Sequence, residues 1–303
     1  MGNASKFVKN GNSNHLSRLV KAMEDINNLP DSYIKKPDGV FGAVAKVICG
    51  NVTINSDDLD LEFTVPFDDD LEANEAEIII YNLTQDTINQ FKYHAVISIE
   101  AGYIGDTGVI FRGYIDRVKT SREGADKITT IRAFDDVSKK TVESISFAAG
   151  TKASYILKTL VNKTGIPIAV MKIRRDYTYK DETTVDGDLM ENIKKYSEVC
   201  GVSTYVCKGK IYCRYIKDGD NINFTVSENT GMIGTPEEYQ EEITAEDYKD
   251  TINGYEIEML LQHRMQTAAI VNINSVYVNG KFRVRSGEHT FNDSGCITKI
   301  KVM

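Results

Sequence analysis

The order of hydrophobic and polar positions divides the chain into four segments. Residues 1–43 carry one helical stripe, residues 44–147 short β-runs, residues 148–234 two amphipathic helices with a hairpin, and residues 235–303 β-runs again. Apolar spacings of three and four indicate helices, and strict alternation indicates half-buried strands. The pattern therefore predicts an α+β, mainly β fold. Two small antiparallel β-barrel-like domains flank a central α/β segment, and an N-terminal helical extension precedes them.

The N-terminal extension has apolar residues on a single face of its predicted helix. A helix with one apolar face has to bury that face against another surface. That surface is either the helix's own domain or a neighbouring subunit, and the sequence leaves both open. The candidate partner-interface residues are Leu16, Leu19, Val20, Met23 and Ile26.

The first β-segment alternates strands with turns, as small barrels and sandwiches do. Its most apolar run ends at Tyr81, and β-branched residues there favour a buried strand. Thr84 is a predicted N-cap, because Leu83 and Ile88 around it fit a hydrophobic staple. The predicted strands cover residues 44–54, 59–65, 76–81, 95–101, 109–118 and 128–134.

The central segment has the start and stop signals of two helices. Thr151 is the predicted N-cap of the first helix and Gly165 its end; Asp188 and Gly201 serve the second in the same way. A hairpin over residues 202–216 follows directly. Helix, helix and hairpin together predict a compact α/β unit.

Beyond the central segment, Thr235 and Pro236 have the form of a helix start. The acidic stretch from there to Asp250 is predicted as a linker carrying a short helix. The remaining chain returns to β-runs, at residues 252–259, 268–275, 276–285 and 296–302.

Two pieces of the chain resemble each other. Residues 87–101 and residues 261–275 each have a short polar lead, followed by an alternating strand that begins with Ala. Each is followed by a turn and another strand. This similarity is compatible with two related barrels separated by the central segment.

Charge excludes one class of function. The chain has 36 basic and 44 acidic residues, for a formal net charge of −8. Duplex binding relies on Lys and Arg that displace counterions from phosphates. Acidic clusters at residues 57–60, 68–72 and 237–242 are interpreted as solvated surface.

The five cysteines, an odd number without a signal peptide, indicate free thiols. No apolar stretch is long enough to cross a bilayer, so we expect a soluble protein made in a cytoplasm, with no membrane insertion.

No pattern of catalytic or metal-binding residues emerges. The four histidines lie far apart, and Cys200, Cys207 and Cys213 do not have the spacing of paired zinc ligands. Residues 201–205 lack the final glycine of a nucleophile elbow. The sequence therefore predicts no enzyme, no catalytic residue, no metal and no cofactor. We interpret Cys207 and Cys213 as small apolar residues that fill buried positions in the hairpin.

Several short motifs, in their order along the chain, resemble a known family. A strand ending in Tyr81-Asn82-Leu83 precedes a short helix, then Ala101-Gly102-Tyr103 and residues 109–113; residues 278–289 are similar to the family's closing strands. The family is the baseplate hub proteins of contractile-tailed phages, of phage-tail-like bacteriocins and of related injection systems. The resemblance covers about residues 44–303, and the N-terminal extension departs from it.

This resemblance implies a structural role in a virion tail baseplate or a phage-tail-like particle. It implies a homotrimeric ring that adapts a six-fold tail tube to a three-fold spike or tip. The implied partners are the tube protein, the spike or tip protein and other baseplate proteins. DNA would pass through the ring without specific binding, and acids at residues 68–70 facing the channel would repel it. The alternatives are a tail-associated cell-wall hydrolase and an unrelated, monomeric cytoplasmic binding module.

Overall fold

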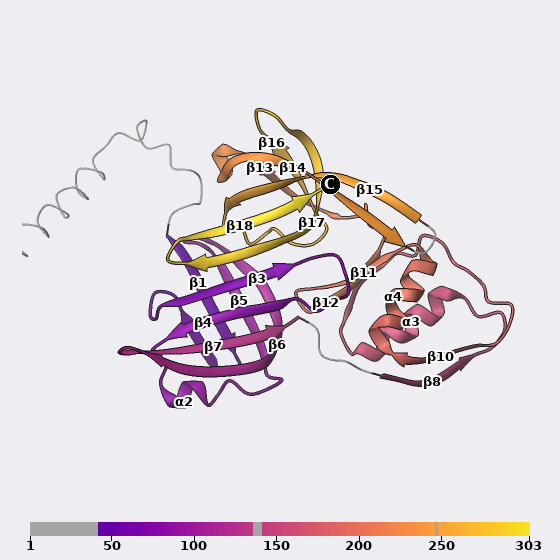
Figure 1. Ribbon diagram of the computed structural model, residues 1–303, viewed down its shortest axis with the longest axis horizontal. Coiled ribbons are helices and arrows are strands. Elements are labelled where there is room, and N and C mark those ends of the chain that lie inside the picture. Colours follow the sequence, from indigo (N-terminus) through magenta and orange to yellow (C-terminus); the bar gives the residue numbers. More distant parts are fainter. Residues whose placement is uncertain (1–41, 136–140, 246–247) are drawn as a thin grey trace, which may run out of the picture. The chain divides into compact units, whose positions relative to one another are not determined.

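A computed structural model describes residues 42–135, 141–245 and 248–303 (Figure 1). Most of them are in strands, and the few helices are short, so the predicted α+β, mainly β fold is confirmed. One 13-stranded sheet runs through both β-rich parts of the chain. The predicted interface residues Leu16, Leu19, Val20, Met23 and Ile26 lie outside the described residues and stay a prediction.

The first β-rich part is a five-strand antiparallel unit with a hairpin added at its end. The order across the sheet is β3-β4-β7-β6-β5, followed by β1 and β2. Inward side chains alternate along each strand; in β4 they are Ala76, Ile78 and Ile80, all fully buried. The strands are β1 (Ala43–Cys49), β2 (Val52–Asn55), β3 (Leu61–Phe67), β4 (Glu75–Tyr81), β5 (Val96–Tyr103), β6 (Asp106–Glu123) and β7 (Asp126–Phe134).

A short helix, α2 (Gln85–Ile88), connects β4 to β5. The predicted N-cap is confirmed, because the Thr84 side chain accepts a hydrogen bond from the backbone N–H of Thr87. The predicted run over residues 44–54 is broken by a turn and forms the β1–β2 hairpin.

Two helices pack side by side in the central segment (Figure 1). They cover an apolar core whose buried residues all belong to this segment. Asp188 caps the second helix by accepting from Met190 N and Glu191 N. The first helix has Lys152 at its N-cap position, without a side-chain hydrogen bond, so the prediction of Thr151 as cap is wrong. Thr151 donates instead to Ala148 O, at 2.6 Å. The elements are β8 (Thr141–Phe147), α3 (Ala153–Thr164), β9 (Ile168–Met171), β10 (Thr183–Asp188), α4 (Leu189–Cys200), β11 (Ser203–Cys207) and β12 (Lys210–Arg214).

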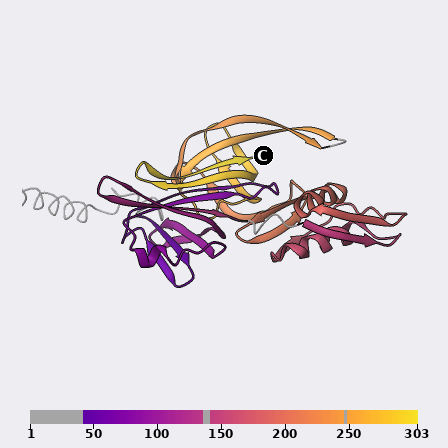
Figure 2. The same ribbon diagram turned by 60° about the horizontal axis from the view of Figure 1, so that its bottom comes forward.

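The second β-rich part repeats the first. Its five antiparallel strands follow the order β14-β15-β18-β17-β16, and β13 joins β16 in parallel. Figure 2 shows β14 and β15 as one long hairpin. The elements are β13 (Asp220–Val226), the 3-10 turn η1 (Glu228–Thr230), β14 (Met232–Ala245), β15 (Tyr248–Leu260), β16 (Ala269–Asn274), β17 (Asn279–Asn292) and β18 (Gly295–Val302).

The strand registers agree with the similarity between the two pieces of sequence. Val96 of β5 lies opposite Tyr114, and Ile270 of β16 lies opposite Arg283. Both long strands then have a bulge after the next residue, between Ile115 and Arg117 in β6 and between Val284 and Ser286 in β17. A bulge inserts one residue and bends its strand at a fixed place. The two five-strand units therefore match in strand order, in register and in the position of a bulge.

The helix expected after Thr235 is wrong, because residues 232–245 form strand β14. The acidic run pairs along its length with β15, which satisfies its backbone groups on that side. Pro236 lies in the bulged part of β14, and β14 is the end strand of the sheet. Proline is tolerated at such positions because it has no N–H to contribute to a ladder.

Two strands pair with strands outside the segment to which the sequence pattern assigns them. β8, grouped by sequence with the first β-domain, pairs with β10 of the central segment. β13, grouped with the central segment, pairs with β16 of the second β-rich part. The outer parts of a predicted segment can thus pair with strands that are distant in sequence.

Strands β3 and β17 join the two β-rich parts into one sheet; they lie side by side in Figure 1. Phe63 and Phe291 are opposite each other, with their rings stacked at 5.4 Å between centroids. Gly287 lies opposite Phe67, and a Cβ added to it would be 2.3 Å from Lys299 O and 2.6 Å from the Phe67 ring. Only glycine fits this close approach.

Candidate assembly surfaces

A buried ion cluster ties the β3–β4 loop to β17. The Asp69 carboxylate is 6% exposed and accepts from Arg283 Nη1 at 2.7 Å and from Arg285 Nη2 at 3.1 Å. Arg285 Nη1 also donates to Glu241 of β14, at 2.7 Å. The interpretation of Asp69 as solvated surface is therefore wrong. Burial and the neighbouring Asp70 carboxyl raise the pKa of Asp68 to about 6.

A second ion cluster connects the β5–β6 turn to the segment before β16. The Asp106 carboxylate accepts a bidentate pair of hydrogen bonds from Arg264, each 2.6 Å long. It also bonds to His263 Nε2, at 3.0 Å. The hydrogen bonds from Arg264, against some desolvation, hold the pKa of Asp106 down at about 2. The cluster thus connects the two β-rich parts by an ion pair.

His289 lies on β17 and is fully buried, which lowers its pKa to about 3. Its Nε2 lies 3.1 Å from Met265 O, which can only accept, so this nitrogen carries the proton. Nδ1 accepts from the hydroxyl of Thr298, at 2.8 Å. Its two ring nitrogens are thus occupied in holding strands together. No set of three or more metal-binding side chains gathers anywhere in the described part of the chain.

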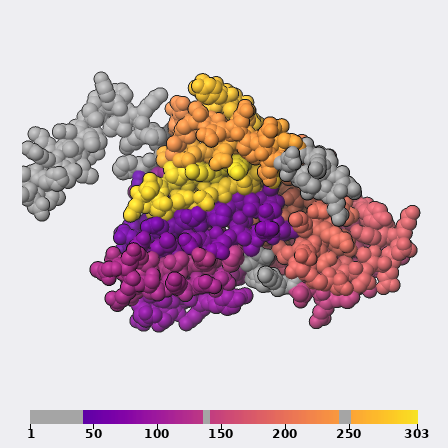
Figure 3. Space-filling view, in the orientation of Figure 1, coloured from indigo at the N-terminus to yellow at the C-terminus, as the bar shows by residue number. Residues whose placement is uncertain are grey.

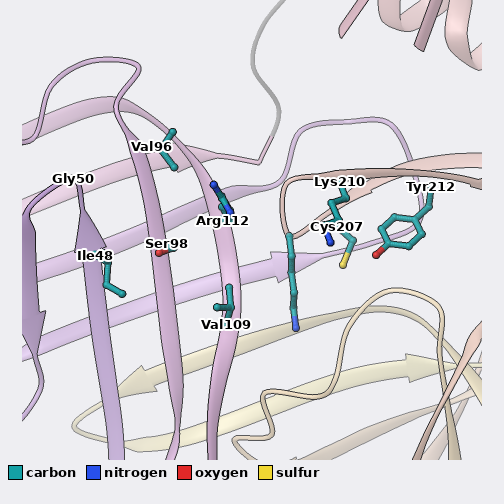
Figure 4. A pocket seen from close by; sticks show the side chains of 10 residues that line it. Ile48, Gly50, Val96, Ser98, Val109, Arg112, Cys207, Lys210 and Tyr212 are labelled. Atoms are coloured by element: carbon teal, nitrogen blue, oxygen red, sulfur yellow. The ribbon is translucent and has the colours of Figure 1, made fainter. Parts of the chain in front are cut away.

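A pocket of about 540 Å³ opens between the first β-rich part and the β11–β12 hairpin (Figure 4). Its apolar wall includes Ile48, Val96 and Val109, and its cationic side chains are Arg112, Lys208 and Lys210. No carboxylate is among the lining residues, so the pocket is electropositive and suits an anionic group.

Burial changes the pKa values of two side chains that line the pocket. Lys208 Nζ donates to His263 O at 3.2 Å, and desolvation lowers the pKa of this lysine. The Cys207 thiol is a poor nucleophile, because burial raises its pKa to about 11. As interpreted from sequence, both Cys207 and Cys213 are buried.

Among the described strands that have a partner on one side only, β14 and β6 present the two longest open edges of the five-strand units. β14 has β15 on one side and no described strand on the other. β6 pairs with β5 only as far as Tyr114, and its remaining half has β7 on one side alone. Open edges offer rows of backbone donors and acceptors to another strand. Exposed charges line both edges: Glu237, Glu238 and Glu241 on β14, and Arg117, Lys119 and Arg122, together with Asp116 and Glu123, on β6.

The fold, with its two similar five-strand units and open strand edges, is that of a mainly β protein, and comparison with known proteins gives its family. Residues 70–291 match the profile of the family described as baseplate hub gp41. The chain belongs to this baseplate hub family and is a component of the virion tail. No curated protein matches the chain.

Solved tail proteins share the fold at very low sequence identity. The tail protein from Neisseria meningitidis MC58 has a TM-score of 0.61 and 9% identity, with 86% of this chain and 96% of that chain covered. The 43 kDa tail protein of prophage MuSo2 from Shewanella oneidensis gives the same four values. An E. coli protein described as a type VI secretion component, similar to the phage T4 tail proteins gp27 and gp5, has a TM-score of 0.58 and 8% identity, with 85% and 76% covered.

Sequence reasoning missed both ion clusters and the basic pocket. Asp69 and Arg283, or Arg112 and Lys210, are far apart along the chain and belong to no local motif. The acidic run 237–242 is predicted from sequence as part of a linker. One signal in the sequence was available: the similarity of residues 87–101 and 261–275 implies that the strands preceding each piece correspond as well.

No helix within the described residues has the length and apolarity to cross a membrane.

Proposed function

We propose that three copies of this hub form a ring that adapts a six-fold tail tube to a three-fold spike or tip. The observation that carries this proposal is the repeated five-strand unit. Three chains with two similar units each present six similar β-units, which suit a six-fold partner. Closed cyclic rings are also the common solution for identical subunits.

The parts of the chain that are not repeated suit the three-fold partner. The central segment with α3 and α4 occurs once per chain, hence three times per ring. We assign the repeated β-units to the tube protein and the unrepeated parts to the spike or tip protein and to other baseplate proteins. The N-terminal stripe Leu16, Leu19, Val20, Met23 and Ile26 is a further candidate contact.

The proposed role is binding without catalysis, and DNA passes through the ring without specific contacts. The net charge of −8 disfavours adhesion to phosphates. Asp69 is excluded from the group of channel acids because it is paired with two arginines. Zymography on cell-wall material tests the absence of catalysis, and a cleared band would overturn it.

Negative-stain electron microscopy and analytical ultracentrifugation of the full chain, with and without the tube protein, test the ring. We expect three-fold particles with a central opening, stacked on tube protein when it is present. A chain that stays monomeric in both conditions would overturn the proposal. The matched control is the tube protein alone, which shows which rings come from the hub.

A further inference from the structure

The two β-units of one chain are joined by a strand pair that has a simple geometry. β17 pairs first with β16 and then runs past the end of β16. β3 occupies the vacated place beside β17, where Val65 lies opposite His289 and Thr64 opposite Thr290. The junction is therefore formed by the outer edge of β3, the end strand of the first unit, and by the C-terminal half of β17, the long strand of the second unit.

Both partners of this junction occur a second time in the chain. In the repeated strand order, β14 corresponds to β3, and β6 corresponds to β17. β14 has its outer edge open among the described residues, and so has β6 beyond the end of β5. The second unit thus carries an unused first strand, and the first unit an unused long strand.

The two open edges are opposite in net charge. Glu237 and Glu238 are exposed on β14, whereas β6 exposes Lys119 and Arg122, with Glu123 beside them. Opposite charges on adjacent strands stabilise a pair, and like charges directly opposite destabilise it. Two copies of β14 would place glutamates close together, so the acidic edge favours β6 over a second β14.

We propose that β14 of one copy pairs antiparallel with β6 of the next copy, in the register that β3 and β17 show within the chain. This register, fixed by the matching bulges and turns, places Glu237 opposite Ser121 and Glu238 opposite Thr120. Glu238 is then diagonal to Arg122, and Glu237 is diagonal to Lys119 on one side and to Glu123 at the end of β6 on the other. Pro236 marks the end of the ladder because it has no N–H.

This inference rests on the proposed ring and specifies its contact. Each chain contributes one internal junction, β3 with β17, and one junction to its neighbour, β14 with β6. The ring then has alternating covalent and non-covalent junctions of the same geometry. Main-chain hydrogen bonds supply the affinity and the charged side chains the choice of partner.

Cysteine cross-linking tests the register directly. Residues opposite each other in an antiparallel pair lie within the Cα separation that a disulfide spans. We expect Glu237→Cys with Ser121→Cys in one chain to give covalent dimers and closed trimers under mild oxidation. The matched control is Thr64→Cys with Thr290→Cys, the equivalent pair of the internal junction, which should cross-link only within a chain.

Each single cysteine variant controls for the native thiols, of which Cys296 is partly exposed and the other four are buried. Covalent dimers and trimers that form equally well in the Glu237→Cys single variant would contradict the proposed register. A trimer seen by ultracentrifugation in which the double variant gives no intermolecular cross-link would overturn the strand contact and leave the ring standing.

A charge exchange tests the partner. Lys119→Glu with Arg122→Glu should weaken the trimer at least tenfold, and adding Glu237→Lys with Glu238→Lys in the same chain should restore it. Lys158→Glu with Lys194→Glu makes the same change of charge on exposed helical positions and should leave the trimer intact.

The outcomes separate the two proposals. A wild-type chain that is monomeric throughout rejects the ring, and the contact with it. A stable wild-type trimer that is insensitive to the Lys119 and Arg122 reversals, or that the glutamate reversals do not restore, rejects the contact alone.

Discussion

Several charged and titratable side chains of this hub are buried for structural reasons. Asp69 is surrounded by two arginines, and His289 is held neutral between Thr298 and Met265. Buried groups with shifted pKa values often mark catalytic sites. Here each one has hydrogen-bond or ion-pair partners on neighbouring segments that account for its burial. Substitutions of these residues should therefore change the stability of the folded protein.

Replacing Asp69 with asparagine should strongly destabilise the protein. Arg283 and Arg285 would keep their buried positive charges without the carboxylate, which costs about 3–5 kcal/mol when one partner of a buried pair is removed. Urea unfolding followed by circular dichroism measures the change. Asp57→Asn, at an exposed position, should change stability by less than about 0.5 kcal/mol. Equal effects of the two substitutions would contradict the role of the cluster.

Asp68 gives a prediction for pH. Its pKa in the folded state is about 6, above the usual value of 3.8. The folded protein therefore binds a proton that the unfolded chain releases between these values, so Asp68 should add stability as the pH falls from about 6 to about 4. Asp68→Asn should remove this part of the pH dependence, seen in unfolding midpoints at several pH values. An unchanged profile would contradict it.

At the scale of the elements, the long strand β17 has the central place. It pairs with β16, β18 and β3, and so holds both β-units in one sheet. The contact with β3 depends on stacked aromatic rings and on the close approach at Gly287. Figure 3 shows the yellow C-terminal strands lying directly on the indigo ones.

Gly287→Val should therefore disrupt the junction between the two units. The added side chain would meet Lys299 O and the Phe67 ring, and overpacking of this kind costs about 1–3 kcal/mol. Ser286→Ala, one residue away and without this contact, should have a small effect. Chemical unfolding of both variants measures the difference. Comparable stabilities would mean that the sheet adapts to a side chain at this position.

At the scale of the molecule, one continuous sheet links the apolar cores of the two five-strand units. The central segment has a core of its own under α3 and α4, with two separate small sheets. The β3–β17 pair and the Asp106–Arg264 ion pair both connect the two β-units. The family match identifies this chain as a baseplate hub protein. The proposed ring is built from the two linked β-units of each copy.

The two β-units should unfold together because β3 and β17 belong to one ladder. Amide hydrogen exchange should show similar protection for residues 63–67 and residues 287–291. The Gly287→Val variant should lower the protection of both segments together. Exchange of residues 63–67 that is much faster than that of β4 in the wild type would contradict a shared unfolding unit.

Local sequence signals determined the strands and helix ends that depend on neighbouring residues. The caps at Thr84 and Asp188 and the stops at Gly165 and Gly201 were predictable, because each acts within one helical turn. The alternation in β4 and β5 was predictable for the same reason, since burial follows a period of two. The repeat and the family motifs were also present in the sequence itself.

Tertiary structure decided the features that join distant parts of the chain. Residues 235–245 form a strand because β15 supplies the hydrogen-bond partners, although their local signals favour a helix start. Asp69 is buried because Arg283 and Arg285 lie across from it, and no spacing in the sequence encodes that pairing. The sequence determined the units, and long-range strand pairing and ion pairing decided how they join, because these contacts depend on positions that only the folded chain brings together.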